Sequence, residues 1–451
     1  VGGLSLSNAI AGAFAEDLPV IAISGGPNTN SVAEHELLHH TLGRIEYNYV
    51  RDVFDRLTVQ SVQITNPVDA PTQIDNAINM ALQRRKPVYL EVAANIAKMP
   101  ISPPCEMTFN LRRKSDPECL NAAVEHAANL LNSAEKPVLI AGVQLRSTGA
   151  EAPFSALASA SNYAVAAMPN AKSFYEETAP NYMGIYWGSV GSPGCNEIVS
   201  SADLGLFAGT TFTDYTTVGH QTLLNHSKMI LARPESVVMP DKTFNEVMLP
   251  EFLDALASKL LPNDKSVVAY WRIAEEKPLP PQANAEDALT TRVLFDRVQR
   301  MLTTDTAIIA ETGDSWFNGM RLDLPSGSRF EIQMQYGSIG WSVGATLGYA
   351  LASSHKRVVA LIGDGSFQMT AQELSTMIRY NVKPIIFLIN NGGYTIEVEI
   401  HDGPYNTIKN WDYVGLMSAF NAETGNGLGL RASKVAELDS AVQKASDHDG
   451  P

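Results

Sequence analysis

Short apolar segments alternate with longer amphipathic ones along the whole chain. Apolar runs such as 19–24 and 87–92 alternate with stretches in which apolar residues recur at helical spacing, such as 6–14. Further apolar runs lie at 137–141, 307–310, 358–362 and 384–389. Runs of this length are typical of strands buried on both faces, as in a parallel sheet. The alternation therefore predicts an α/β protein built from doubly wound parallel sheets.

Two proline-rich segments divide this pattern into three blocks. The segments are 99–117 and 275–288, and each contains a cluster of prolines among charged and polar residues. Such clusters are typical of linkers rather than of helices or sheet interiors. We therefore predict three domains, at 1–100, 118–270 and 289–451.

The composition is that of an acidic globular protein. There are 33 basic and 48 acidic side chains, which gives a formal charge of −15. This balance argues against a surface for nucleic acid or for an anionic membrane, because both require clustered Lys and Arg. No run of about 20 apolar residues is present, so no membrane-spanning helix is predicted. Cys105, Cys119 and Cys195 are too few and too scattered for a disulfide framework or a zinc site, which favours a reducing, cytoplasmic compartment.

The second block contains a weak candidate for dinucleotide binding. Its strand at 137–141 leads into a stretch at 142–149 that begins and ends with glycine. That stretch lacks the G-x-G-x-x-G spacing that lets the backbone approach a pyrophosphate. We therefore expect a structural role for this block rather than NAD binding.

The third block holds the strongest chemical signal, which is a polar turn after an apolar strand. The strand at 358–362 leads into Gly363 and then into Asp364, Gly365 and Ser366. Open α/β sheets bind ligands at the carboxyl ends of their strands. Backbone N–H groups at a turn that enters a helix, here expected at 371–380, form a natural cradle for a diphosphate.

A second polar turn, one helix and one strand later, completes a set of oxygen ligands for a metal. Asn391 and Gly393 follow the apolar run that ends at Ile389. Asp364 offers a carboxylate, Asn391 a side-chain carbonyl and Gly393 a backbone carbonyl, and Mg²⁺ prefers oxygen ligands. Each turn alone is an ordinary feature of loops. The pair, each after an apolar strand and at this spacing, is specific and predicts a Mg²⁺-diphosphate site.

The paired turns resemble the signature of thiamine-diphosphate enzymes, which is a Gly-Asp-Gly opening and an Asn-Asn close. Five further segments are similar to the pyruvate decarboxylase family: 38–40, 310–317, 335–341, 394–397 and 401–413. The resemblance covers essentially the whole chain and is strongest across 305–415. It implies a carboxy-lyase that converts pyruvate to acetaldehyde and carbon dioxide with thiamine diphosphate and Mg²⁺. It also implies that the three blocks are, in order, pyrimidine-binding, central and diphosphate-binding domains.

The resemblance also implies roles for residues that bind the cofactor. Thr312 belongs to the cofactor-binding set. The carbonyl of Gly337 accepts a hydrogen bond from the amino group of the cofactor, and Ile339 is the apolar wedge that keeps the cofactor bent. Either of the last two residues, taken alone, would be interpreted as loop packing.

The catalytic residues implied by the resemblance come from two blocks. Glu397 faces the reacting carbon and protonates the enamine, which is the work of a general acid. His39 and His40 form a proton relay from the pyrimidine-binding domain, a role that suits histidine near neutral pH. The family forms homodimers or homotetramers with active sites between subunits. We therefore expect the histidines of one chain to face Glu397 of another.

The size of the substrate is predicted from large apolar side chains in the same motifs. Trp316, Phe317, Ile396 and Ile400 crowd the implied pocket, which favours pyruvate in a fermentative enzyme over a bulkier 2-oxo acid such as indolepyruvate or phenylpyruvate. A flavin-containing carboligase similar to acetolactate synthase is disfavoured by the motif at 312–316. A non-catalytic binding protein is disfavoured by the intact metal and acid residues.

Both ends of the sequence are interpreted as cut. In the family, a glutamate near the start of the pyrimidine-binding domain protonates the cofactor ring, and that region precedes Val1. The end of the diphosphate-binding domain would follow Pro451. We therefore expect a fragment that lacks both termini and, on its own, part of the catalytic machinery.

Overall fold

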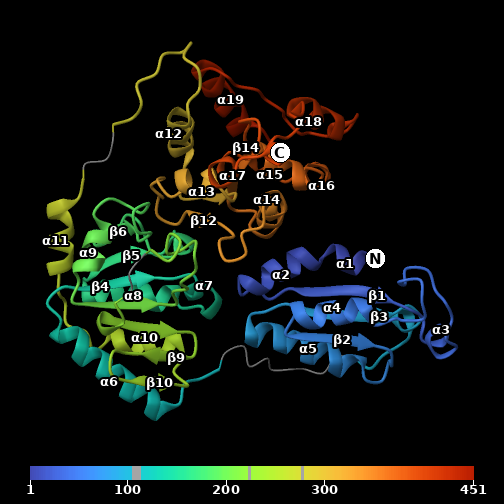
Figure 1. Cartoon of the computed structure of the whole chain (residues 1–451), viewed down its shortest axis with the longest axis horizontal. Helices are drawn as coiled ribbons and strands as arrows, with labels where there is room; N and C mark the ends of the chain where they lie inside the picture. Colours follow the sequence, from blue (N-terminus) through green and yellow to red (C-terminus); the bar gives the residue numbers. More distant parts are fainter. Residues whose placement is uncertain (104–112, 222–224, 276–278) are drawn as a thin grey trace. The chain divides into compact units, whose positions relative to one another are not determined.

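The computed structural model describes residues 1–103, 113–221, 225–275 and 279–451. It divides into two compact units, Val1–Ser115 and Asp116–Pro451, which Figure 1 shows coloured along the sequence. The two predicted linkers fall partly on residues outside the described ranges. Among the described residues, no helix is long and apolar enough to cross a bilayer.

The first unit is built on a three-stranded parallel sheet. Its strands β1 (Ile21–Gly26), β2 (Gln60–Ile64) and β3 (Val88–Ala93) lie in the order β1-β3-β2. Its helices are α1 (Gly2–Ser5), α2 (Ser7–Ala15), α3 (Thr29–Ala33), α4 (Tyr49–Leu57), α5 (Ala70–Arg84) and the 3-10 turn η1 (Ile96–Lys98).

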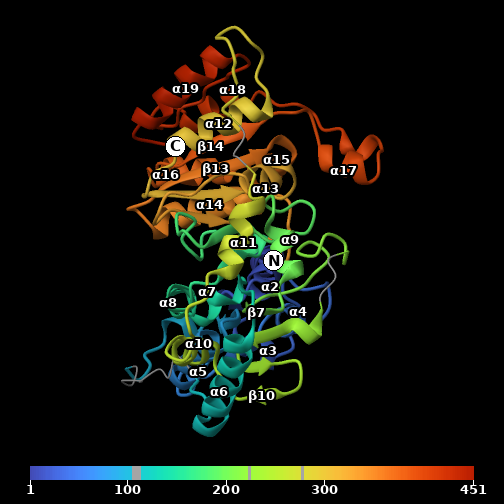
Figure 2. The same cartoon turned by 90° about the vertical axis from the view of Figure 1, so that its left-hand side faces the viewer.

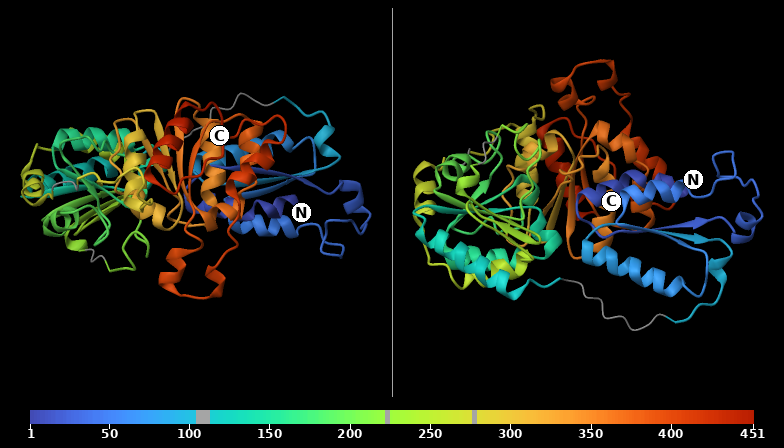
Figure 3. Two further views of the ribbon diagram at one scale, coloured as in Figure 1. Left: turned by 90° about the horizontal axis from the view of Figure 1, so that it is seen from above. Right: turned by 60° about the horizontal axis from the view of Figure 1, so that its bottom comes forward.

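Helices cover both faces of this sheet, as Figure 3 shows. Successive side chains of a strand point to opposite faces. Tyr89 therefore packs with Phe54 of α4 on one face, where the two rings stack with centroids 4.1 Å apart. Val88 and Leu90 pack with α5 on the other face. The predicted strands at 19–24 and 87–92 are thus found, each shifted by one or two residues.

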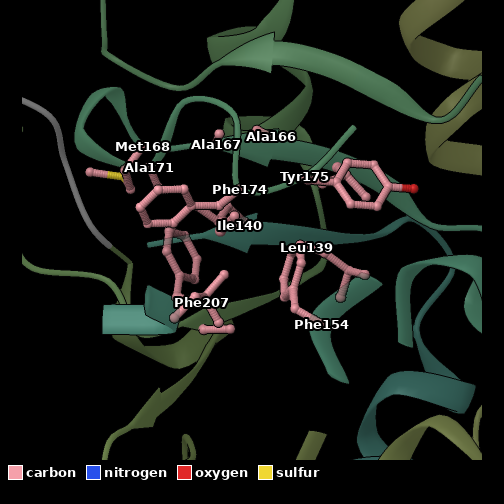
Figure 4. Close-up of a cluster of buried hydrophobic side chains, with 14 of the residues drawn as sticks. Leu139, Ile140, Phe154, Ala166, Ala167, Met168, Ala171, Phe174, Tyr175 and Phe207 are labelled. Atoms are coloured by element: carbon pink, nitrogen blue, oxygen red, sulfur yellow. The ribbon is translucent and has the colours of Figure 1, made fainter. Parts of the chain in front are cut away.

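The second unit contains a seven-stranded sheet in the order β10-β9-β8-β7-β4-β5-β6. Its strands are β4 (Pro137–Ala141), β5 (Ala164–Ala167), β6 (Tyr182–Ile185), β7 (Leu204–Ala208), β8 (Met229–Arg233), β9 (Ser236–Val238) and β10 (Thr243–Asn245). Its helices are α6 (Pro117–Ser133), α7 (Gln144–Thr148), α8 (Glu151–Ser161), α9 (Cys195–Ser201), α10 (Leu249–Ala257), α11 (Lys265–Ile273) and the 3-10 turns η2 (Pro169–Ala171) and η3 (His226–Lys228). Figure 4 shows Leu139 and Ile140 of β4 beside a group of aromatic rings: Phe154, Phe174 and Phe207.

The edge of this sheet departs from the expected all-parallel arrangement. The strands from β6 to β8 are parallel, but β9 pairs antiparallel with both β8 and β10. Each of the two added strands has only three residues. A hairpin strand needs no crossover helix. For this reason the alternation of strands and helices did not predict it.

The second unit also contains a four-stranded parallel sheet in the order β12-β11-β13-β14. Its strands are β11 (Thr306–Ala310), β12 (Arg329–Glu331), β13 (Arg357–Gly363) and β14 (Ile385–Ile389). Its helices are α12 (Thr291–Met301), α13 (Asp314–Gly319), α14 (Trp341–Ala352), α15 (Asp364–Thr370), α16 (Glu373–Arg379), α17 (Thr395–Ile400), α18 (Tyr413–Asn421), α19 (Val435–Asp447) and the 3-10 turn η4 (Pro404–Asn406). Figure 2 shows helices on both faces of this sheet.

The start of α15 corrects one prediction. Asp364, Gly365 and Ser366 were expected in a turn before a helix at 371–380, but they form the first turn of α15 itself, and a separate helix α16 follows. Phe367 is buried among the residues of the sheet core, which holds this first turn against β13. An acidic residue in the first turn also complements the positive end of the helix dipole. The α/β class with mostly parallel sheets is confirmed.

Candidate active site

Three neighbouring strands deliver the candidate residues to one edge of the four-stranded sheet. The register pairs Ala310 of β11 with Leu361 of β13, and Gly363 of β13 with Ile389 of β14. Because the three strands are parallel, the segments that follow them leave the sheet side by side. Thr312, Asp364 and Asn391 belong to these segments.

Asp364 is the first residue of α15, and its side chain is buried and hydrogen-bonded. Its side chain is only 1% exposed. Its Oδ1 accepts the backbone N–H of Gly365 at 2.8 Å, and its Oδ2 accepts the N–H of Gly392 at 2.7 Å. The carboxylate therefore joins the opening turn to the closing turn.

The amide of Asn391 completes a cluster of three groups that fits a cation. One terminal atom of this amide lies 3.0 Å from both Asp364 Oδ1 and the carbonyl oxygen of Gly393. With nitrogen at this position the amide donates to both oxygens. With oxygen there, three oxygens face one another and a cation is needed between them. Ligands about 2.1 Å from Mg²⁺ and at right angles to each other lie about 3.0 Å apart, so this spacing suits octahedral Mg²⁺.

The candidate site contains few of the side chains that most often bind metals. In the part of the chain that the structure describes, no group of three or more His, Cys, Asp or Glu side chains could hold a metal. The candidate site combines a single carboxylate with an amide and a backbone carbonyl. This oxygen-only set is of the kind that Mg²⁺ uses together with substrate phosphates and water.

Two glycines in the paired motifs are required by close contacts. A Cβ on Gly365 would lie 2.5 Å from the ring of Tyr394, whose hydroxyl donates to the Gly365 carbonyl at 3.3 Å. Gly393 has φ of +150°, and a Cβ there would lie 2.5 Å from the carbonyl oxygen of Asn406. Burial, together with the charge of Asp364, raises the pKa of Tyr394. The tyrosine therefore stays neutral beside the carboxylate.

The loop before α14 carries the other two residues of the implied cofactor set. Gly337 has φ of +67°, and a Cβ there would lie 3.2 Å from the ring of Tyr215. Ile339 is half-buried in the same loop. The carbonyl of Gly340 accepts the hydroxyl of Thr370, at the end of α15, at 2.7 Å. The structure thus brings the 337–340 loop to the helix that begins at Asp364, whereas the roles of Gly337 and Ile339 remain predictions.

The implied substrate-pocket residues differ in their surroundings. Trp316 is buried, and within the described part of the chain its indole Nε1 has no hydrogen-bond partner. The ring of Trp316 meets the ring of Tyr215 edge to face at 5.5 Å. A Cβ on Gly313 would lie 3.5 Å from Ile396, which places the first turn of α17 next to the segment of Thr312. Ile400, at the end of α17, is 72% exposed.

The three candidate catalytic residues lie in different units. Glu397 is half-buried in the first turn of α17. His39 and His40 are exposed in the first unit, with ring centroids 4.5 Å apart. His40 has φ of +61°, and the hydroxyl of Tyr49 donates to its carbonyl at 2.6 Å. The structure brings the two histidines together, and their approach to Glu397 remains a prediction.

Sequence reasoning missed three residues that contact the candidate site. Glu311 directly precedes Thr312 and is fully buried, and Tyr215 packs against Trp316 from the loop that follows β7. The hydroxyl of Thr395 lies 3.1 Å from the second terminal atom of the Asn391 amide. A charged residue at the end of an apolar strand was a signal for Glu311. Nothing in the sequence pointed to Tyr215.

Comparison with known proteins agrees with this arrangement. A family model described as thiamine pyrophosphate enzyme, central domain, matches residues 124–247. A second, described as thiamine pyrophosphate enzyme, C-terminal TPP binding domain, matches residues 312–451 and so includes Asp364, Asn391 and Gly393.

Curated relatives match along almost the whole chain. Pyruvate decarboxylase 3 of Arabidopsis thaliana is 48% identical over 99% of this chain and 76% of the relative. Pyruvate decarboxylase 1 of Zea mays is 48% identical over 98% of this chain and 73% of the relative. A probable pyruvate decarboxylase of Schizosaccharomyces pombe is 46% identical over 99% of this chain and 78% of the relative.

Proposed function

The chain belongs to the family of thiamine pyrophosphate-dependent pyruvate decarboxylases, and we propose that it converts pyruvate to acetaldehyde and carbon dioxide with thiamine diphosphate and Mg²⁺. The observation that carries the proposal is the approach of the Asn391 amide to both Asp364 Oδ1 and the Gly393 carbonyl oxygen, at 3.0 Å each. This cluster lies at the first turn of α15, where backbone N–H groups are free of intrahelical partners and suit a phosphate.

The residues present fit the metal and the diphosphate of the cofactor. Asp364, Asn391 and Gly393 would hold Mg²⁺. The turn of Gly365 and Ser366 would receive the diphosphate, with the Ser366 backbone N–H as a donor, since the Gly365 N–H already donates to Asp364 Oδ1. Thr312, Gly337 and Ile339 would hold the rest of the cofactor, and the positive φ of Gly337 supports a special backbone position there. The bound cofactor supplies the nucleophilic carbon and the electron sink that decarboxylation requires.

The side chains of this protein would then position the substrate and move protons. Trp316, Ile396 and Ile400 limit the space beside the methyl group of pyruvate. Glu397 handles the substrate carboxylate and donates the proton that releases acetaldehyde, which is general acid work. His39 and His40 relay protons to this position.

The same proposal extends to the organisation of the protein. Residues 1–100 form the pyrimidine-binding domain, 118–270 the central domain and 289–451 the diphosphate-binding domain. The protein assembles as a homodimer or homotetramer with His39 and His40 of one subunit facing Glu397 of another. It works in the cytoplasm in fermentation. A structure of the assembled protein with both sets of residues from one chain, or an active monomer, would contradict the shared site.

The test is an activity assay on the full-length protein. Carbon dioxide and acetaldehyde are measured from pyruvate, with thiamine diphosphate and Mg²⁺ each present or withheld. We expect turnover only when both are present. Turnover that does not depend on either one would contradict the cofactor assignment, and a higher kcat/KM for phenylpyruvate than for pyruvate would contradict the substrate.

A further inference from the structure

Glu311 is a fully buried carboxylate surrounded by hydrogen-bond donors. Its exposed fraction is 0%, and it follows the last residue of β11. Its Oε1 accepts the backbone N–H of Thr312 at 2.8 Å. Its Oε2 accepts both the backbone N–H of Ser342 at 3.1 Å and the hydroxyl of Ser342 at 2.5 Å.

These contacts join three separate segments of the candidate site. Ser342 lies in the first turn of α14, directly after the loop that carries Gly337 and Ile339. Thr312 belongs to the segment after β11. The backbone N–H of Glu311 also donates to the carbonyl of Leu361 at 3.0 Å, on the strand that ends just before Asp364. A single residue is therefore bonded to all three segments.

We propose that Glu311 is a positioning residue that holds the segments of Thr312, Gly337–Ile339 and Asp364 in the arrangement that binds the cofactor. The proposal rests on the proposed function, since it assumes that these segments bind thiamine diphosphate. Glu311 itself touches none of the reacting atoms. It acts through the backbone positions of its neighbours.

The chemistry of the contacts requires a carboxylate of this length. The N–H of Thr312 and the N–H of Ser342 can only donate, so each needs an acceptor. An ionised carboxylate accepts through both oxygens, whereas Gln would place an NH₂ group against one of these donors. Asp is one methylene shorter and cannot span both segments. Burial of a charge is costly unless it is well paired, and burial is the main reason that the pKa of Glu311 is raised, against the opposing effect of its hydrogen bonds.

A purely structural role for Glu311 is the competing explanation, and Thr346 provides a matched control. Thr346 is fully buried one turn further along α14, and its hydroxyl donates to the carbonyl of Ser342 at 2.7 Å. Thr346→Val removes a buried hydrogen bond from the same helix without touching a cofactor-binding segment. Both substitutions should lower the melting temperature, but only Glu311→Gln should weaken cofactor binding.

The experiment measures the Kd for thiamine diphosphate at saturating Mg²⁺ by calorimetry, and the Tm without cofactor, for the full-length protein. We expect Glu311→Gln to raise the Kd by about tenfold or more, because one buried N–H loses its acceptor. Ser342→Ala, which removes only the hydroxyl contact, should raise it by a smaller factor. Thr346→Val should lower the Tm and leave the Kd at the wild-type value.

Two outcomes would overturn the proposal. The first is a wild-type Kd for thiamine diphosphate in both Glu311→Gln and Ser342→Ala. If Glu311→Gln does not fold, a wild-type Kd in Ser342→Ala alone overturns the proposal. The second is a rise in Kd for Thr346→Val as large as that for Glu311→Gln, since general loosening of α14 would then explain it. A wild-type chain that does not bind thiamine diphosphate would instead contradict the proposed function as a whole.

Discussion

The two ends of the candidate site are built in different ways. At the metal end, Asp364 is 1% exposed and accepts two backbone N–H groups. At the substrate end, α17 contains no buried residue, and Ile400 is 72% exposed. The segment that carries α17 projects away from the sheet, as Figure 2 shows.

We therefore expect cofactor binding to depend on the metal end and catalysis to depend on α17. The metal end lies where β13 and β14 leave the sheet, so the core that forms the sheet also forms the ligand cluster. A helix of six residues without a buried face has little stability of its own, because most helix stability in proteins comes from packing. We therefore expect changes at the metal end to affect cofactor binding, and changes in α17 to affect turnover or substrate choice.

The largest effect is expected at Asp364. Asp364→Ala removes the only carboxylate of the proposed Mg²⁺ ligands and also the acceptor that joins the two turns. Mg²⁺-dependent binding of thiamine diphosphate, measured by calorimetry, should be abolished. Asp402→Ala, at an exposed carboxylate just after α17, is the control and should bind normally. Tight cofactor binding by Asp364→Ala at ordinary Mg²⁺ would refute the metal assignment.

At Glu397 in α17 we expect the opposite result, in which turnover falls and cofactor binding is unchanged. Glu397→Gln keeps the size of the side chain but removes the acid, and general acid catalysis typically contributes about 10²–10⁴-fold. The kcat for pyruvate should fall by about that factor, while the Kd for thiamine diphosphate stays unchanged. Glu399→Gln, at an exposed position of the same helix, should leave both values unchanged. If Glu397→Gln loses cofactor affinity instead of kcat, the two ends of the site are not separable.

The same contrast explains which parts of the molecule could be predicted from the sequence. The strands before Asp364 and Asn391 were found because continuous apolar runs mark buried parallel strands, and the spacing of the polar turns then predicted the candidate metal site. Tyr215 could not be found, because its contact with Trp316 joins the loop after β7 to helix α13, about a hundred residues later in the chain. The bonds from Glu311 to Ser342 likewise depend on how a strand end meets a helix start.

The position of His39 and His40 relative to Glu397 also could not be predicted from the sequence. Adjacent histidines predict a shared role only through the resemblance, and the structure adds that His39 and His40 are exposed with their rings 4.5 Å apart. Their distance from Glu397 depends on how separate units and subunits assemble. No local pattern in either segment encodes that distance.

A smaller effect is expected from the apolar side chains of α17. Removing a large side chain from a close-packed pocket relieves overpacking of roughly 1–3 kcal/mol, which is about one to two powers of ten in rate. Ile396→Ala should therefore raise kcat/KM for phenylpyruvate relative to pyruvate by about that factor, because Ile396 lies next to Gly313. The same assay on Ile400→Ala tests whether the exposed end of α17 also lines the pocket.

The result for Ile400→Ala shows whether the end of α17 is covered in the assembled protein. Ile400 is 72% exposed in the single chain. An effect equal to that of Ile396→Ala would mean that assembly covers the end of α17. Val398→Ala, also at an exposed position of the helix, is the control and should not change the ratio. An unchanged ratio in both isoleucine variants would show that α17 does not set substrate size.

The smallest effect is expected at the metal end and concerns the pH dependence of stability. Burial is the largest influence on Glu311 and raises its pKa above 4.5, while hydrogen bonds from Ser342 and Thr312 oppose it. The folded chain therefore holds this proton more tightly than the unfolded chain does. The stabilising contribution is fully present below the unfolded pKa and is lost as pH rises through the folded pKa. The free energy of unfolding of the wild type, relative to Glu311→Gln, should fall as pH rises through the range just above 4.5.

Urea denaturation of both proteins without cofactor, at a series of pH values through that range, measures this difference. Subtracting the Glu311→Gln values removes the contributions of groups that titrate alike in both proteins, which leaves the titration of Glu311. A difference that rises with pH would mean that hydrogen bonds from Thr312 and Ser342 outweigh burial. The carboxylate would then stabilise the folded metal end in addition to positioning its segments.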